Sequence, residues 1–208
     1  MTLRRLLGGL AAVLASLPLA ACTNDAPDQG ERPPVIVPGA PGEPASTLAP
    51  GQQLPPPPQP NAADVSFISR MVVHHQQALD MAALVPERAA DDQVKGVAAR
   101  IADSQRPEID TMNAWLREHA HAGAHDMTDM GAMPGMATPG QLDALKAARG
   151  GDFDTMFLRL MIAHHQGAID MSHEVQNQGS DVRVQEIADE VIAVQSGEIN
   201  RMRGIAGR

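Results

Sequence analysis

The sequence predicts an all-α protein, a four-helix bundle built from two copies of one helical hairpin and preceded by a disordered Pro-rich tether. Two observations support this prediction. Residues 63–208 repeat themselves at a constant offset of 90 positions, so both halves of the domain contain the same two segments. Within those segments the apolar residues recur every three or four positions, which is the period of a helix. Two hairpins that bury their apolar stripes together form a four-helix bundle.

The first 62 residues are expected to lie outside the bundle. Residues 1–21 combine Arg4 and Arg5, an apolar stretch and small residues, as in a bacterial signal peptide. Cys22 is the only cysteine, and it completes a lipobox with the Leu-Ala-Ala that precedes it. We therefore expect lipidation at Cys22 and an extracytoplasmic protein anchored to the cell membrane or the outer membrane, in the periplasm or at the cell surface. The alternative is an ordinary secretory signal.

The linker, residues 22–62, contains twelve prolines and no aromatic residue. Such a segment cannot bury enough apolar surface to fold alone, and its prolines favour extended chain. We expect it to be a spacer between the lipid anchor and the bundle. The alternative is a proline-rich ligand for a partner protein.

Composition argues against nucleic-acid binding. The formal net charge is −9, and it becomes −11 once the two arginines of the signal peptide are removed. A protein that binds a polyanion needs clustered basic residues, and none are found here. Aromatic residues make up only 2% of the chain, so base stacking is also unsupported.

The two repeats span about residues 63–116 and 153–206, and a connection over 119–140 joins them. In the first helix of each repeat, Phe67, Met71, His74, His75, Gln76, Ala78, Asp80 and Met81 recur as Phe157, Met161, His164, His165, Gln166, Ala168, Asp170 and Met171. The second helices share Val94, Ala98, Gln105, Glu108, Ile109 and Met112 with Val184, Ala188, Gln195, Glu198, Ile199 and Met202. We expect Pro86 to mark the end of the first helix.

Polar residues interrupt the apolar stripes at equivalent positions of both repeats. His74 and His75 follow Met71 by three and four residues, so at least one imidazole should point into the bundle. In an antiparallel hairpin these histidines lie roughly opposite Gln105 and Glu108. The second repeat brings its own histidine pair to Gln195 and Glu198. A lone buried histidine is usually a satisfied core residue, but two adjacent pairs with facing carboxylates favour a metal site.

Methionines beside these histidines favour copper over zinc or nickel. Thioether sulfur is a soft ligand that suits Cu(I), and imidazole binds Cu(I) or Cu(II). The predicted metal ligands are His74, His75, Met71, Met81, His164, His165, Met161 and Met171. Residues expected to assist them, as additional ligands or through hydrogen bonds, are Gln105, Glu108, Met112, Gln195, Glu198, Met202, Asp80 and Asp170.

The connection carries a second set of candidate copper ligands, separated by Gly, Asp, Ala and Pro. They are His119, His121, His125, Met127, Met130, Met133 and Met136, and the methionines are expected to be exposed. Flexible His- and Met-rich tracts bind copper without a preformed cage. Binding there should be weak, because ordering the loop opposes it. The alternative is a disordered loop whose methionines are incidental.

The paired motifs MVVHHQQALDMA and MIAHHQGAIDMS resemble those of the bacterial family called domain of unknown function 305, over about residues 63–205. The resemblance implies a ferritin-like four-helix bundle and an extracytoplasmic copper-binding role in copper tolerance. By this resemblance the ligands are His74, His75 and Met81 in the first motif and His164, His165 and Met171 in the second. The Pro-rich tether is not part of the family pattern.

The sequence therefore predicts a copper-binding lipoprotein that sequesters copper ions or hands them to unidentified carrier proteins. Two alternatives remain, a ferritin-like metal-dependent oxidase and a metal-free interaction module. The oxidase signature places Glu-x-x-His on two helices, and no Glu stands three residues before His74 or His164. The sequence also contains no nucleophile elbow, phosphate loop or dinucleotide motif, so it offers little support for an enzyme.

Overall fold

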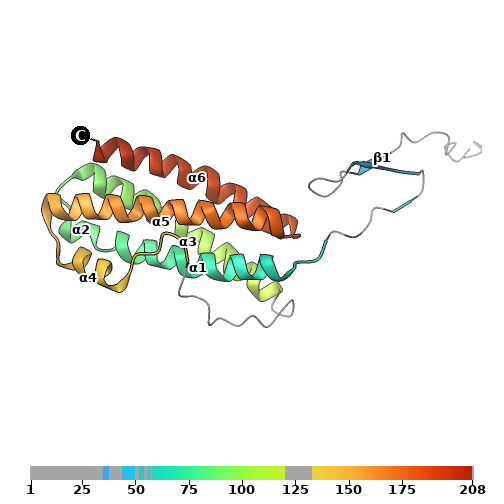
Figure 1. The fold of residues 1–208 in the computed structure, drawn as a ribbon, viewed down its shortest axis with the longest axis horizontal. Helices are drawn as coiled ribbons and strands as arrows, with labels where there is room; N and C mark the ends of the chain where they lie inside the picture. Colours follow the sequence, from blue (N-terminus) through green and yellow to red (C-terminus); the bar gives the residue numbers. More distant parts are fainter. Residues whose placement is uncertain are drawn as a thin grey trace, which may run out of the picture. The chain divides into compact units, whose positions relative to one another are not determined.

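A computed structural model describes residues 35–37, 44–49, 52–53, 56, 58–119 and 133–207. Within them, the bundle shown in Figure 1 consists of the long helices α1 (Ala62–Ala82), α3 (Asp92–Glu118), α5 (Gly150–Gln178) and α6 (Val182–Ala206). Two shorter helices, α2 (Val85–Arg88) and α4 (Pro139–Ala147), lie in the connections. The predicted all-α class and four-helix bundle are confirmed.

Each repeat forms one helical hairpin. α1 packs against α3, α5 packs against α6, and α1 and α5 contact each other in opposite directions between the hairpins. The helix starts are encoded locally: Asn61 and Asp64 form a capping box at α1. Asp91 and Asp181, at equivalent positions of the repeats, cap α3 and α6 by accepting backbone N–H groups.

Proline has a different effect here from the one the sequence suggested. α1 already ends at Ala82, and Pro86 lies in the first turn of α2. Proline fits there because the first N–H groups of a helix have no partner within that helix. α3 continues through Pro107 and α6 through Gly197, so neither residue ends its helix.

The core consists of two apolar clusters that the internal repeat relates. One cluster includes Met71, Met112 and Met171, and the other includes their equivalents Met161, Met202 and Met81. Each cluster thus takes two methionines from one repeat and the third from the other. This exchange follows from the opposite directions of α1 and α5, which bring the start of one motif beside the end of the other. Neither hairpin completes its core alone.

Two buried aspartates at equivalent positions join the hairpins. Oδ2 of Asp64, in α1, accepts hydrogen bonds from the backbone N–H groups of Ser180 and Asp181 at 3.0 and 3.1 Å. Oδ2 of Asp154, in α5, accepts from the N–H groups of Ala90 and Asp91 at 3.2 and 2.9 Å. Each aspartate therefore holds the turn that precedes the second helix of the other repeat.

The end of the connection between the hairpins forms an ordered segment, residues 133–138, which we call the strap. The expectation of exposed methionines is wrong here, because Met133 is buried and Met136 is partly buried against the core. Gln77 fixes the strap by donating to the Ala137 carbonyl at 3.0 Å and accepting from its N–H at 2.7 Å. An additional helix that the repeat pattern did not predict, α4, begins directly after the strap with a capping box at Thr138.

Glycine lets the strap approach α5 closely. Gly167 stands where the first repeat has Gln77, and a Cβ atom at Gly167 would overlap the Pro134 carbonyl. Gly135 adopts a positive φ of 75°, and a Cβ there would overlap the backbone of Ala163. The repeats thus differ at this position in the way that the strap requires. The Gln77 side chain binds the strap, and Gly167 has no side chain to obstruct it.

The linker contains a two-stranded antiparallel sheet, β1 (Val35–Val37) paired with β2 (Ser46–Leu48). The sequence predicted extended chain in the linker but not this strand pairing. The β-branched residues Val35, Ile36 and Val37 favour it. The signal peptide and Cys22 lie outside the described residues. In the described part of the chain, no helix combines the length and apolar character needed to cross a membrane.

Replacing Asp64 with Ala should lower the free energy of unfolding by about 2–4 kcal/mol, because several N–H donors then lose a charged acceptor. The matched control is Asp80→Ala, which removes an exposed carboxylate that accepts a hydrogen bond from Gln76 within its own helix. That change should cost under about 0.5 kcal/mol. Urea denaturation of both variants measures the difference, and equal losses would show that the aspartate does not join the hairpins.

Candidate metal centre

Four histidines from α1 and α5 meet in the middle of the bundle. His74, His75, His164 and His165 all have 0% relative exposure. The rings of His74 and His164 are in contact, with centroids 3.8 Å apart and planes inclined at 36°. Because these two residues are equivalent in the repeats, their contact lies on the pseudo-twofold axis of the bundle. Adjacent residues in each motif therefore place both imidazoles in the core.

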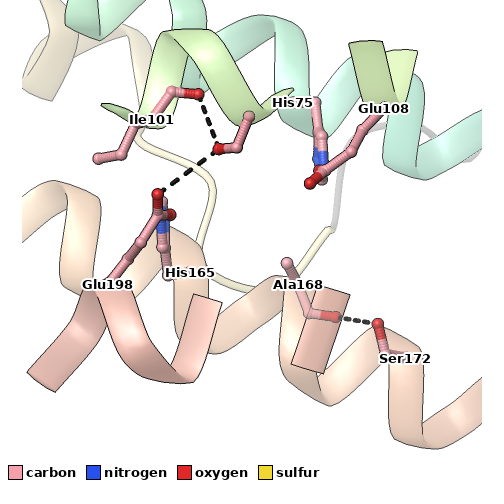
Figure 2. Close-up of polar contacts among 8 residues, drawn as sticks. His75, Ile101, Glu108, His165, Ala168, Ser172 and Glu198 are labelled. Atoms are coloured by element: carbon pink, nitrogen blue, oxygen red, sulfur yellow. Dashed lines mark hydrogen bonds and ion pairs between the residues drawn. The ribbon is translucent and has the colours of Figure 1, made fainter. Parts of the chain in front are cut away.

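The outer histidine of each pair binds a glutamate from the second helix of its own repeat. His75 Nε2 lies 2.7 Å from Glu108 Oε2, and His165 Nε2 lies 2.6 Å from Glu198 Oε2. Figure 2 shows each carboxylate beside its imidazole. A carboxylate accepts, so both Nε2 atoms carry the proton. In the neutral tautomer this leaves Nδ1 with its lone pair, and neither Nδ1 has a hydrogen-bond partner among the described residues.

The inner histidines differ from each other. His74 Nε2 donates to the Pro134 carbonyl of the strap at 2.9 Å, so the lone pair of its neutral ring is also on Nδ1. His164 has no hydrogen-bond partner on either ring nitrogen within the described part of the chain. The strap therefore makes the two halves of the centre unequal, although the repeats supply the same histidines.

Burial keeps the inner pair neutral. It lowers the pKa of His74 to about 4, opposed in part by the hydrogen bond to Pro134. Burial likewise holds the pKa of His164 well below its ordinary value, and the neighbouring His74 lowers it further. A neutral imidazole is the form that binds a metal ion.

Gln105 and Gln195 add two buried amides at equivalent positions of α3 and α6. Each is 1% exposed, and none of their side-chain N and O atoms has a partner in the described residues. Buried polar groups are normally hydrogen-bonded, so orphaned atoms on both glutamines and four imidazoles mark this core as unusual. Such a core fits a bound cation, which accepts lone pairs that protein donors leave free.

The predicted methionine ligands are all buried in the same bundle core. Met71, Met81 and Met161 are 0% exposed, and Met171 is 3% exposed. Met112 and Met202, named as assisting residues, are equally buried, and Met133 of the strap joins the cluster of Met71, Met112 and Met171. The strap therefore adds a thioether to one of two otherwise equivalent methionine sets.

Other predicted residues lie elsewhere. Asp80 and Asp170 are exposed and bond to Gln76 and Gln166 along their own helices, so their positions give no support for a role at the histidines. His119 follows α3, and its ring stacks on Trp115. Its Nδ1 is hydrogen-bonded to the Trp115 carbonyl at 2.9 Å. Met136 lies in the strap. The remaining loop candidates fall outside the described residues: His121, His125, Met127 and Met130.

Within the described ranges, no three His, Cys, Asp or Glu side chains are arranged to hold one metal ion. A site made from these histidines therefore needs thioether sulfurs or a rearrangement of the His–Glu pairs. Sequence reasoning missed two features, the strap carbonyl on His74 and the Gln77 amide that fixes the strap. The difference between Gln77 and Gly167 in otherwise matching motifs is the signal that could have revealed them.

Acidification should destabilise the metal-free protein between pH 6.5 and about 4. Unfolded histidine binds a proton below its ordinary pKa, whereas buried His74 stays neutral down to about 4. As the pH falls, the unfolded state therefore binds a proton before the folded state does. At pH 5 this lowers the free energy of unfolding by about 2 kcal/mol for His74 alone. Urea denaturation at pH 7.5 and 5 measures the loss. His74→Gln should reduce the pH dependence, and an unchanged dependence would contradict a neutral buried His74.

Comparisons with known proteins identify the family of this fold. The sequence profile of the family named domain of unknown function (DUF305) matches residues 64–206. A DUF305 fragment from Deinococcus radiodurans is 34% identical with a TM-score of 0.64, and the match covers 74% of this chain and 99% of that one. A DUF305 protein from Streptomyces coelicolor, named as a predicted secreted protein, is 32% identical with a TM-score of 0.62, covering 69% and 89%.

CopM has been solved in Cu(II)-bound, Cu(I)-bound and silver-bound forms. Its Cu(II)-bound form is 33% identical with a TM-score of 0.57, and the match covers 69% of this chain and 95% of CopM. No curated protein sequence matches. The profile match spans both helical hairpins and the histidine pairs between them, and on this basis the chain belongs to the DUF305 family.

Proposed function

We propose that this protein binds copper at its four buried histidines, with methionine sulfurs completing the coordination. The observation that supports this most strongly is that the buried imidazoles keep lone pairs for which the described residues offer no hydrogen-bond partner. An unpaired buried polar group costs about 1–3 kcal/mol, so leaving several of them is expensive for a purely structural core. A metal ion would satisfy those lone pairs.

The ligand types support copper among the metals. Imidazole and thioether together suit Cu(I), and the described core contributes no thiolate. The proposed ligands are His74, His75, Met71, Met81, His164, His165, Met161 and Met171. The similar protein CopM has been solved with Cu(I), Cu(II) and silver, which are the ions that this donor set would favour.

The cellular role that we propose is to sequester copper outside the cytoplasm or to pass it to carrier proteins. The export signal and the lipobox at Cys22 support a membrane-anchored lipoprotein, with residues 22–62 as the tether. The His- and Met-rich residues 119–130 would capture ions weakly. Binding and release of an ion need no change in its oxidation state, so this role requires no catalysis.

Anaerobic titration with Cu(I) against a chromophoric chelator tests the proposal. The protein should lack residues 1–21 and carry Cys22→Ser, so that no thiol competes for the metal. We expect tight, stoichiometric Cu(I) binding. Failure to compete for copper combined with tight binding of iron or zinc would reassign the centre to another metal, and failure to bind any of the three would favour the metal-free module.

The double variant Met71→Leu/Met161→Leu should weaken Cu(I) binding by at least about tenfold, because leucine fills the same space without a sulfur ligand. The matched control is Met156→Leu in α5, whose methionine packs against the core without being a proposed ligand. The same chelator competition measures both. Equal affinities in the two variants would show that Met71 and Met161 serve only as core filler.

A further inference from the structure

A groove between α3 and α6 leads toward the histidine centre from the solvent. Its volume is about 260 Å³, and it is lined by Glu108, Thr111 and Met112 from α3 and by Arg183, Glu190 and Val194 from α6. Ser104 also lines it. Thr111 and Glu190 are exposed at its mouth, whereas Met112 is fully buried. The groove therefore runs from solvent to the buried side chain of Met112, a core methionine.

One glutamate of the centre lines this groove, and the other contacts a residue that lines it. Glu108 lines it directly and lies 2.7 Å from His75. The hydroxyl of Ser104 lies 3.5 Å from Glu198 Oε1, and the other carboxylate oxygen of Glu198 contacts His165 (Figure 2). The side chains of Glu108 and Glu198 are 15% and 12% exposed, whereas the imidazoles they hold are completely buried. The carboxylates are thus the part of each pair that solvent touches.

The opposite approach to the histidines is closed. The strap lies against α1 and α5, and three hydrogen bonds hold it, two from Gln77 and one from His74. Met133 and Ala137 of the strap are each 6% exposed, so this side offers the centre little contact with water. An ion that enters here must first displace the strap, whereas the groove between α3 and α6 is already open.

We propose that copper reaches and leaves the buried histidines through the groove between α3 and α6, with Glu108 as the first protein ligand it meets. The inference rests on the proposed copper function. Glu108 and Glu190 make the groove attractive to cations, and the positive charge of Arg183 is already paired with Glu186 at 2.8 Å. The ion passes from a carboxylate to the softer Met112 sulfur and the imidazoles as it loses water.

The test fills the groove with a bulky side chain at an exposed position. Thr111→Trp should slow both Cu(I) uptake and Cu(I) release by at least about tenfold, because a blocked path affects both directions while the ligands stay in place. The equilibrium affinity should therefore stay unchanged. The control is Thr155→Trp, which makes the same change at an exposed threonine in a different groove, between α3, α5 and α6. Stopped-flow transfer to and from a chromophoric chelator measures all rates.

A second variant tests the competing path. Gln77→Ala removes the two hydrogen bonds that fix Ala137, so it should loosen the strap while leaving copper exchange within about twofold of the wild-type rate. The proposal would be overturned if Thr111→Trp exchanged copper at the wild-type rate. Faster exchange in Gln77→Ala, together with an unchanged rate in Thr111→Trp, would show that the ion enters past the strap. If the wild-type protein did not bind Cu(I) stoichiometrically, the proposed function itself would be overturned. The two failures are therefore distinguishable.

Discussion

The burial of four imidazoles where α1 meets α5 is the constraint on which the rest of this structure depends. Complete burial removes the water that would satisfy their nitrogens and keeps the inner pair neutral. Glu108 and Glu198 supply acceptors for the outer rings, and the Pro134 carbonyl supplies one for His74. Each of these partners uses Nε2, so the arrangement that stabilises the rings also leaves lone pairs on Nδ1.

Internal duplication explains both the symmetry and the departure from it. Asp64 and Asp154 hold the opposite hairpin through the same kind of contact, and the two methionine sets exchange a member between repeats. A single strap cannot obey that symmetry, because it crosses the pseudo-twofold axis once. Gln77 and Gly167 resolve the conflict at equivalent positions, one by binding the strap and the other by giving it space.

Much of the fold could be predicted because helical period and repetition are local properties of the sequence. The repeat predicted the hairpins, and counting along an antiparallel pair placed the histidine pair roughly opposite Gln105 and Glu108. The strap could not be predicted, since its position depends on a contact between Gln77 and Ala137, sixty residues apart. Composition alone suggested exposed methionines at 133 and 136, but burial of an apolar side chain overrode the polar character of the surrounding loop.

The two copies within this one chain also bear on the choice between a metal centre and a structural histidine network. They differ at Gln77 and Gly167 and at Pro107 and Gly197, yet both contain His-His-Gln, the flanking methionines and the facing Gln and Glu. A core that only had to pack would be more stable with apolar side chains in place of orphaned imidazoles and amides. The imidazoles that weaken the metal-free core are also ligands that copper accepts, which makes metal binding the more economical explanation of their presence in both repeats.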